Sequence, residues 1–186
     1  MALRQMERTP ARFSAEHYLR LDIDERTELL GGVIYRVSPR NEPHSFAVAT
    51  LARLLIRGLG DDYAVRIQDH VAVPDWRGKN APEIDVAVLK RGYYEPGPTA
   101  VDACAFIEVA HTTYGGRMGD RAYKIPLYVG AGVPSWIVNI AKRQVECYAS
   151  PEDLALPHGR VTGESGTIDI LGVSIPVRDL FGNRRP

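Results

Sequence analysis

The chain has 186 residues, which fits one domain able to bury roughly 70% of the surface that the unfolded chain exposes. Its 23 basic and 23 acidic residues cancel, which argues against a permanent, high-affinity nucleic-acid binder but not against an enzyme with a local basic groove. There is no long apolar run, no signal-peptide pattern and no CxxC pair, so we expect a soluble, cytoplasmic protein without membrane, disulfide or zinc-ribbon features.

The first half of the chain predicts two helices, a hairpin and strand structure. Residues 1–12 are expected to be a flexible tail, which leaves residues 13–186 as a single domain. Two adjacent glycines favour a tight turn between short strands, and regular apolar spacing indicates the longest helix. The expected elements are a helix over 14–21 capped by Ser14, strands 28–30 and 33–37 around Gly31-Gly32, a helix over 44–57, and strand structure over 63–73.

The second half predicts the centre of a sheet and a bent helix. Two apolar, β-branched runs are typical of core strands, and Pro126 should bend the helix after them because proline lacks an N–H donor. The expected elements are strands 84–89 and 105–110, a helix over 118–130, a hairpin of 135–140 and 144–149, and short strands ending in a helical turn over 159–181. The order predicts an α/β fold with a central, mixed, mostly antiparallel sheet flanked by helices.

A carboxylate interrupts each of the two core strands. Asp85 lies in the run PEIDVAVL and Glu108 in the run FIEVA, and Lys124 follows on the next helix. A buried carboxylate is costly without a cation or hydrogen-bond donors. Two carboxylates on neighbouring strands, near an ammonium group, predict a site for Mg²⁺ or Mn²⁺ and hydrolysis of a phosphodiester. The carbonyl of Val109 could add a third oxygen, and Lys124 could orient the water or stabilise developing negative charge.

Each of these residues alone has a plainer interpretation. Asp85 could be a core carboxylate satisfied by backbone amides, and Glu108 could pair with any nearby arginine. Asp120 and Lys124 are four residues apart, which is also the spacing of an ordinary ion pair on a helix surface. The ordered combination of all of them is far more specific than any one of them.

Six short motifs follow one another along the chain. They are Glu28-Leu-Leu-Gly-Gly-Val-Ile, Ser38-Pro39 followed by His44, Pro82-Glu-Ile-Asp85, Ile107-Glu108-Val109, Asp120-xxx-Lys124-xxx-Tyr128, and Ala131-Gly-Val-Pro-x-Trp136. In this order they resemble the Uma2 family, formerly DUF820, of the PD-(D/E)XK restriction-endonuclease-like superfamily. The resemblance extends over about residues 13–177.

The resemblance implies a restriction-endonuclease-like core that hydrolyses DNA. Asp85 and Glu108 would be catalytic metal ligands, Glu28 an additional acidic residue in the metal shell, and Lys124 the catalytic lysine. In the simplest form of the motif this lysine lies two residues after the second carboxylate, where this chain has Ala110.

Four further residues are candidate substrate contacts, and three of them keep an alternative. His44 could line the site or only cap its helix, and Arg117 and Arg121 could contact phosphate or be solvated surface residues. Tyr128 continues the helix face of Asp120 and Lys124. The link of residues 111–119 is longer and richer in glycine than the family pattern. A homodimer would suit a duplex, which has two strands to cut.

Two other functions remain open at this stage. The chain could be a non-catalytic binding or assembly module of the same fold, which its neutral charge and the altered link at 111–119 favour. It could also hydrolyse another phosphate ester with the same metal chemistry.

Overall fold

A computed structural model describes residues 12–37, 39–74, 79–110 and 119–182. Its centre is a six-stranded sheet with the strand order β3-β4-β5-β6-β7-β8, in which only β5 and β6 are parallel. The predicted α/β class and mostly antiparallel sheet are therefore confirmed. The strands are β3 (Tyr63–His70), β4 (Glu83–Lys90), β5 (Ala103–Ala110), β6 (Ser135–Asn139), β7 (Gln144–Tyr148) and β8 (Arg160–Gly163).

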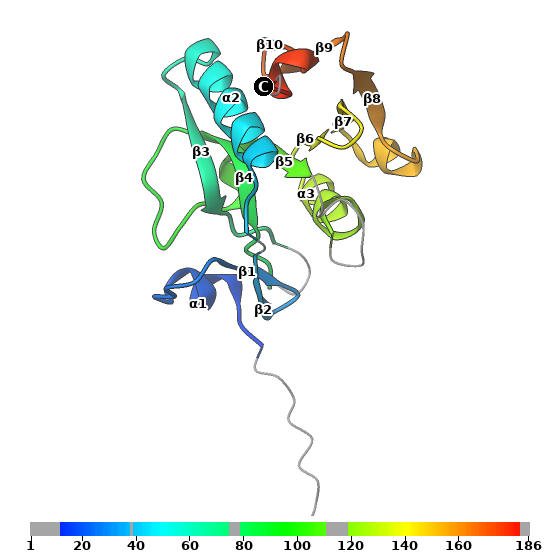
Figure 1. The fold of residues 1–186 in the computed structure, drawn as a ribbon. Coiled ribbons are helices and arrows are strands. Elements are labelled where there is room, and N and C mark those ends of the chain that lie inside the picture. The colour runs from blue at the N-terminus through cyan, green and yellow to red at the C-terminus, as the bar shows by residue number, and fades with distance from the viewer. Residues whose placement is uncertain (1–11, 38, 75–78, 111–118, 183–186) are drawn as a thin grey trace, which may run out of the picture.

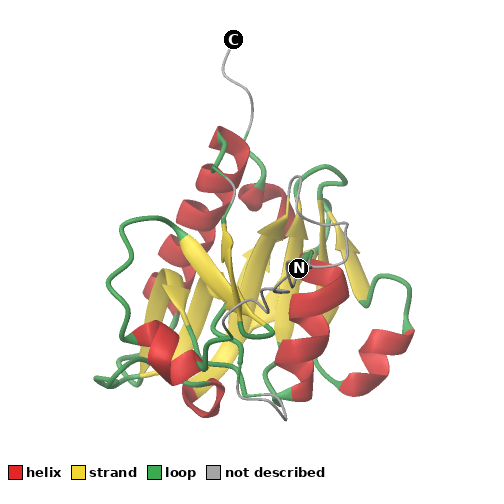
Figure 2. Cartoon of the chain, turned by 90° about the horizontal axis from the view of Figure 1, so that it is seen from below, coloured by secondary structure: helices red, strands yellow, loops and turns green. Residues whose placement is uncertain are grey.

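Helices cover both faces of the sheet, as Figure 2 shows. On one face lies α2 (Glu42–Gly58), whose buried Val48, Leu51 and Leu55 pack with Val86 and other residues of the central strands. On the other face lies α3 (Ile125–Gly130), packed against residues of β4, β5 and β6. The two core layers explain why β4 and β5 read as nearly continuous apolar runs.

Two small units lie at the ends of this sheet (Figure 1). One unit is the hairpin of β1 (Thr27–Leu30) and β2 (Val33–Arg36) with the short helix α1 (Ala15–Leu19), which Ser14 caps as predicted. The other is the hairpin of β9 (Thr167–Ile170) and β10 (Val173–Pro176), followed by the 3₁₀ turn η4 (Val177–Leu180) beside α2. Two further 3₁₀ turns are η1 (Ala100–Asp102) and η3 (Pro151–Ala155).

The helix predicted over 118–130 consists of two pieces, and residue 118 lies outside the described residues. A π-turn, η2 (Asp120–Lys124), comes first and α3 continues from Ile125. The N–H of Ile125 donates to the carbonyl of Asp120, five residues back. The widened turn ends next to Pro126, which has no N–H for an ordinary helical bond, so the expected bend is a local change of helix type.

The cysteines and the helices concern two features that the sequence did not lead us to expect, a disulfide and a membrane span. Both cysteines are free and partly buried, and both pack against the core layer under α2. Among the described residues, none of the helices has the length and apolar character needed to cross a membrane.

Candidate active site

Asp85 lies where β4 and β5 begin to pair. Val86 is paired with Ile107, so Asp85 and Glu108 are the next residues on these two antiparallel strands. The N–H of Val109 donates to Oδ2 of Asp85 at 2.9 Å, and Nε2 of His44 lies 3.1 Å from Oδ1. Burial alone would raise the pKa of Asp85, but the bonds from His44 and Val109 outweigh it and hold the pKa below its usual value. Asp85 is therefore held as a carboxylate by donors on two elements.

Glu108 is the most deeply buried acid of the group, with 2% of its surface exposed. The hydroxyl of Tyr128 donates to its Oε1 at 2.6 Å. Burial raises the pKa of Glu108 well above its usual value, and the neighbouring charges of Asp120 and Asp85 raise it further against the attraction of Lys124. The carboxyl of Glu108 thus gains most from any additional positive charge placed beside it.

Lys124 projects its ammonium group into a set of acids from three elements. Its Nζ lies 2.9 Å from Oε2 of Glu28, 3.5 Å from Oε1 of Glu108 and 3.6 Å from Oδ1 of Asp120, and it donates to the carbonyl of Glu83 at 3.3 Å. Burial would lower the pKa of Lys124, but Glu108, Asp120 and Glu28 raise it well above its usual value. The lysine is therefore a fixed cation at every ordinary pH.

The balance of charge in this group is strongly negative, and the donors suit a hard divalent cation. Glu28, Glu108 and Asp120 lie within 3.6 Å of the Lys124 ammonium group. A fourth acid, Asp85, is paired with His44 and precedes Val86, the partner of Ile107, on the neighbouring strand. Within the described ranges, no three or more His, Cys, Asp or Glu side chains form a cluster that could hold a metal ion. Magnesium is usually held by only one or two carboxylates, with water and substrate phosphate as the other ligands. Asp85 and Glu108 fit that requirement in number and in chemistry.

The comparisons with known proteins agree with the motif order. A family model named Uma2 and described as "Putative restriction endonuclease" matches residues 15–178. The chain belongs to the Uma2 family. A crystal structure titled as a putative nuclease belonging to DUF820, from Anabaena variabilis ATCC 29413, is similar in fold, with a TM-score of 0.69 at 13% identity over 91% of this chain and 97% of that one. No curated protein matches the sequence. Membership supports a nuclease at the level of the family.

The structure of this Uma2 protein gathers most, but not all, of the predicted residues. Glu28, Glu108 and Lys124 meet directly, while Asp85 joins them through the pairing of β4 with β5 and through its electrostatic interaction with Lys124. His44, at the start of α2, contacts Asp85.

The other candidate substrate contacts lie in different surroundings. Tyr128 is fully buried and donates to Glu108, so its contact is with a site residue. Arg121 donates to the carbonyls of Leu156, at 3.3 Å, and of Pro157. Arg117 and the link at 111–118 lie outside the described residues.

Sequence reasoning missed the residues that tie the site elements of this Uma2 protein together. Asn80 is completely buried, and its Oδ1 accepts from the N–H of Gly31 at 2.8 Å and from the hydroxyl of Tyr123 at 2.9 Å. Glu83 is held by Arg26 and lies 3.6 Å from Arg40. These contacts join residues more than 40 positions apart, and neither periodicity nor a short motif indicates them.

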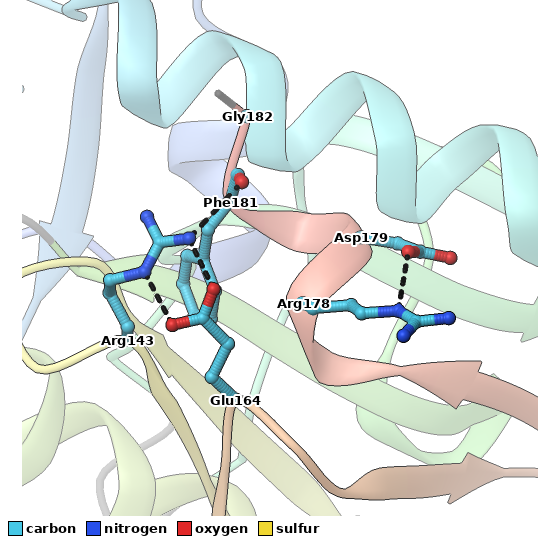
Figure 3. Close-up of a pocket in the computed structure, with 6 residues that line it drawn as sticks. All are labelled: Arg143, Glu164, Arg178, Asp179, Phe181 and Gly182. Carbon is cyan, nitrogen blue, oxygen red and sulfur yellow. Dashed lines mark hydrogen bonds and ion pairs between the residues drawn. The ribbon is translucent and has the colours of Figure 1, made fainter. Parts of the chain in front are cut away.

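A separate hollow of about 450 Å³ lies beside η4 (Figure 3). Its charges are paired within it: Arg143 binds Glu164 and lies over the ring of Phe181 at 5.0 Å, and Arg178 lies 3.6 Å from Asp179. None of the predicted site residues lines it. The carboxylate group around Lys124 is therefore the candidate active site.

Proposed function

We propose that this Uma2 protein is a Mg²⁺- or Mn²⁺-dependent endonuclease that hydrolyses phosphodiester bonds in DNA. The observation that carries the proposal is the buried lysine of the family motif, placed within 3.6 Å of carboxylates from β1, β5 and η2. An ordinary surface ion pair would not place a single ammonium group among three acids that are each nearly inaccessible to water. The proposed substrate class follows from membership in a family of restriction-endonuclease type.

Asp85 and Glu108 are the residues that would hold the cation, with Glu28 at the edge of its shell. When bound, such a cation polarises the scissile phosphate and lowers the pKa of a coordinated water. The protein presents both oxygen donors in fixed orientations. Val109 and His44 hold Asp85, and Tyr128 holds Glu108. Residues that orient metal ligands in this way commonly govern metal affinity.

Lys124 would stabilise charge in this mechanism. In the metal-free protein Glu108, Asp120 and Glu28 raise the pKa of Lys124 well above its usual value, so the amine is an ammonium group at neutral pH and not a base. An ammonium group beside the phosphate can instead donate to a non-bridging oxygen and stabilise the negative charge that develops there.

The test is a substrate panel with the wild-type protein and the Glu108→Gln variant. Duplex DNA, single-stranded DNA, RNA and a small chromogenic phosphodiester are each incubated with Mg²⁺ or Mn²⁺ and with a chelator. We expect metal-dependent internal cleavage of DNA by the wild type and none by the variant. Turnover of the small ester alone would assign a different phosphate ester as substrate. No turnover, and no metal-dependent shift in Tm, would assign a non-catalytic module instead.

A homodimer is proposed only because a DNA duplex has two strands to cut. Two copies of the site, one for each strand, would let a homodimer make a double-strand break. Sedimentation of the protein with and without duplex DNA measures this, and a dimer bound to a duplex is the expected species. A monomer that only nicks one strand would contradict the dimer but not the nuclease.

A further inference from the structure

Asn80 lies between the two elements that supply the lysine and its nearest acid. Glu28 comes from β1 of the hairpin, and Lys124 comes from η2, nearly one hundred positions later in the chain. Their 2.9 Å ion pair is the shortest contact that Lys124 makes with the three acids around it. Any contact that fixes the hairpin against η2 therefore also fixes the position of the ammonium group.

The backbone on either side of Asn80 is bonded to the hairpin like a third strand. The N–H of Gly32 donates to the carbonyl of Lys79 at 2.8 Å, and Leu29 and Ala81 exchange two bonds of 3.1 and 2.9 Å. The side chain of Asn80 completes this attachment, because its oxygen accepts from the N–H of Gly31 at 2.8 Å. The turn of the hairpin is thereby held on segment 79–81.

The same oxygen of Asn80 also reaches η2. The hydroxyl of Tyr123, the residue before Lys124, donates to it at 2.9 Å. Gly31 has a φ of +59°, and a Cβ built there would lie 3.4 Å from that hydroxyl. Tyr123 therefore lies against the hairpin turn and meets Asn80 there.

We propose that Asn80 is a positioning residue for Lys124. Its carboxamide oxygen joins the hairpin turn to η2 through two hydrogen bonds, and this junction sets the distance between Glu28 and the ammonium group of Lys124. The consequence for catalysis rests on the proposed nuclease function; the consequence for the placement of Lys124 does not. Because Asn80 is completely buried, removal of its oxygen breaks both hydrogen bonds at a place that water cannot easily reach.

The first test reads the placement of Lys124 without any activity. Lysines are acylated in the folded protein with a limiting amount of reagent, and the rate at each lysine is read by mass spectrometry, with the exposed Lys90 as internal reference. Wild-type Lys124 should react slowly, because its side chain is 9% exposed and paired with acids. In Asn80→Ala we expect a rise on the order of tenfold, the scale of losing a partly buried hydrogen bond.

Three further variants separate positioning from a general loss of stability. Asn139→Ala is the matched control, since Asn139 is also buried and its Oδ1 accepts a backbone N–H, from Lys142 at 3.1 Å. It should leave the rate at Lys124 unchanged. Asn80→Asp keeps the accepting oxygen and should keep Lys124 slow even where Tm falls. Tyr123→Phe should raise the rate, and it replaces Asn80→Ala if that variant does not fold.

The second test concerns the reaction itself. If the wild type cleaves DNA, Asn80→Ala should lower kcat with little change in KM, while Asn80→Asp should retain most of kcat. An unchanged rate of acylation in Asn80→Ala and Tyr123→Phe, or an equal rise in Asn139→Ala, would overturn the proposal. An inert wild-type enzyme would remove the proposed function, whereas the acylation result would still decide the role of Asn80.

Discussion

Replacing Lys124 with methionine should destabilise the metal-free protein strongly. The substitution keeps a long apolar side chain and removes the positive charge that lies 2.9, 3.5 and 3.6 Å from Glu28, Glu108 and Asp120. Removing one partner of a buried ion pair costs about 3–5 kcal/mol, because the remaining charge has no compensation. For a protein of this length that corresponds to a fall in Tm of roughly 6–20 °C.

The same reasoning gives the dependence on pH and on cations. Because the pKa of Glu108 is raised well above its usual value, Glu108 takes up a proton more readily than an exposed acid as the pH falls. The loss of stability in Lys124→Met should therefore be smaller at acid pH than at pH 8. Added Mn²⁺ should stabilise the variant more than the wild type, since the cation no longer competes with an ammonium group.

Calorimetry or denaturant unfolding at pH 5 and pH 8, with and without Mn²⁺, measures these effects. Lys90→Met is the matched control, because Lys90 is exposed and its Nζ donates to the carbonyl of Val101 at 3.4 Å. That control should change stability by less than about 0.5 kcal/mol. A loss below about 1 kcal/mol in Lys124→Met, or one that does not depend on pH, would refute the inference that Lys124 neutralises buried acids.

Three other substitutions have definite expected outcomes. Glu108→Gln should abolish cleavage and yet raise the stability of the metal-free protein. The wild type loses stability as the pH rises from the pKa of Glu108 in the unfolded chain to its raised pKa in the folded protein, and the variant does not. The stability advantage of the variant in denaturant titrations should therefore grow with pH. Arg121→Met should lower Tm, because it removes the hydrogen bonds to the carbonyls of Leu156 and Pro157. It should leave the slope of log DNA affinity against log salt concentration unchanged, whereas loss of a phosphate contact would reduce that slope by about one. Asn41→Ala should lower the free energy of unfolding by about 1 kcal/mol, measured by thermal unfolding, because it removes the cap of α2. Cleavage should fall only if the loss of the cap also moves His44 away from Asp85.

The local elements were predictable because their causes are local. The apolar spacing of α2, the glycine pair between β1 and β2 and the β-branched runs of β4 and β5 each act within one segment. Asp85, Glu108 and Lys124 were predictable together because a charge inside an apolar run needs a partner, whereas Glu28 was indicated only by the resemblance to the Uma2 family. The pairing of β4 with β5 then brings Asp85 beside Glu108 without any further assumption.

The supports of the site were not predictable because they depend on contacts between distant segments. Asn80 ends a mostly polar stretch of sequence and has no neighbour pattern that indicates burial, yet it joins residues 49 positions before it and 43 positions after it. The π-turn before α3 is closed by the N–H of Ile125, which donates to the carbonyl of Asp120 five residues back, and no helical periodicity contains that spacing. Tyr128 could be recognised as part of the helix face, but its contact with Glu108 instead of solvent depends on the packing of α3.

The most direct test of the account is cleavage of supercoiled plasmid by chelator-treated protein as Mn²⁺ is added back. Wild type and Asp85→Asn are compared at equal concentration, with Asp169→Asn, an exposed acid on β9, as the purification control. We predict nicking that appears only with the metal, persists in Asp169→Asn and is lost in Asp85→Asn at every Mn²⁺ concentration. Cleavage that survives in Asp85→Asn, or that continues in the chelator, would contradict the assignment of this carboxylate group as the catalytic site.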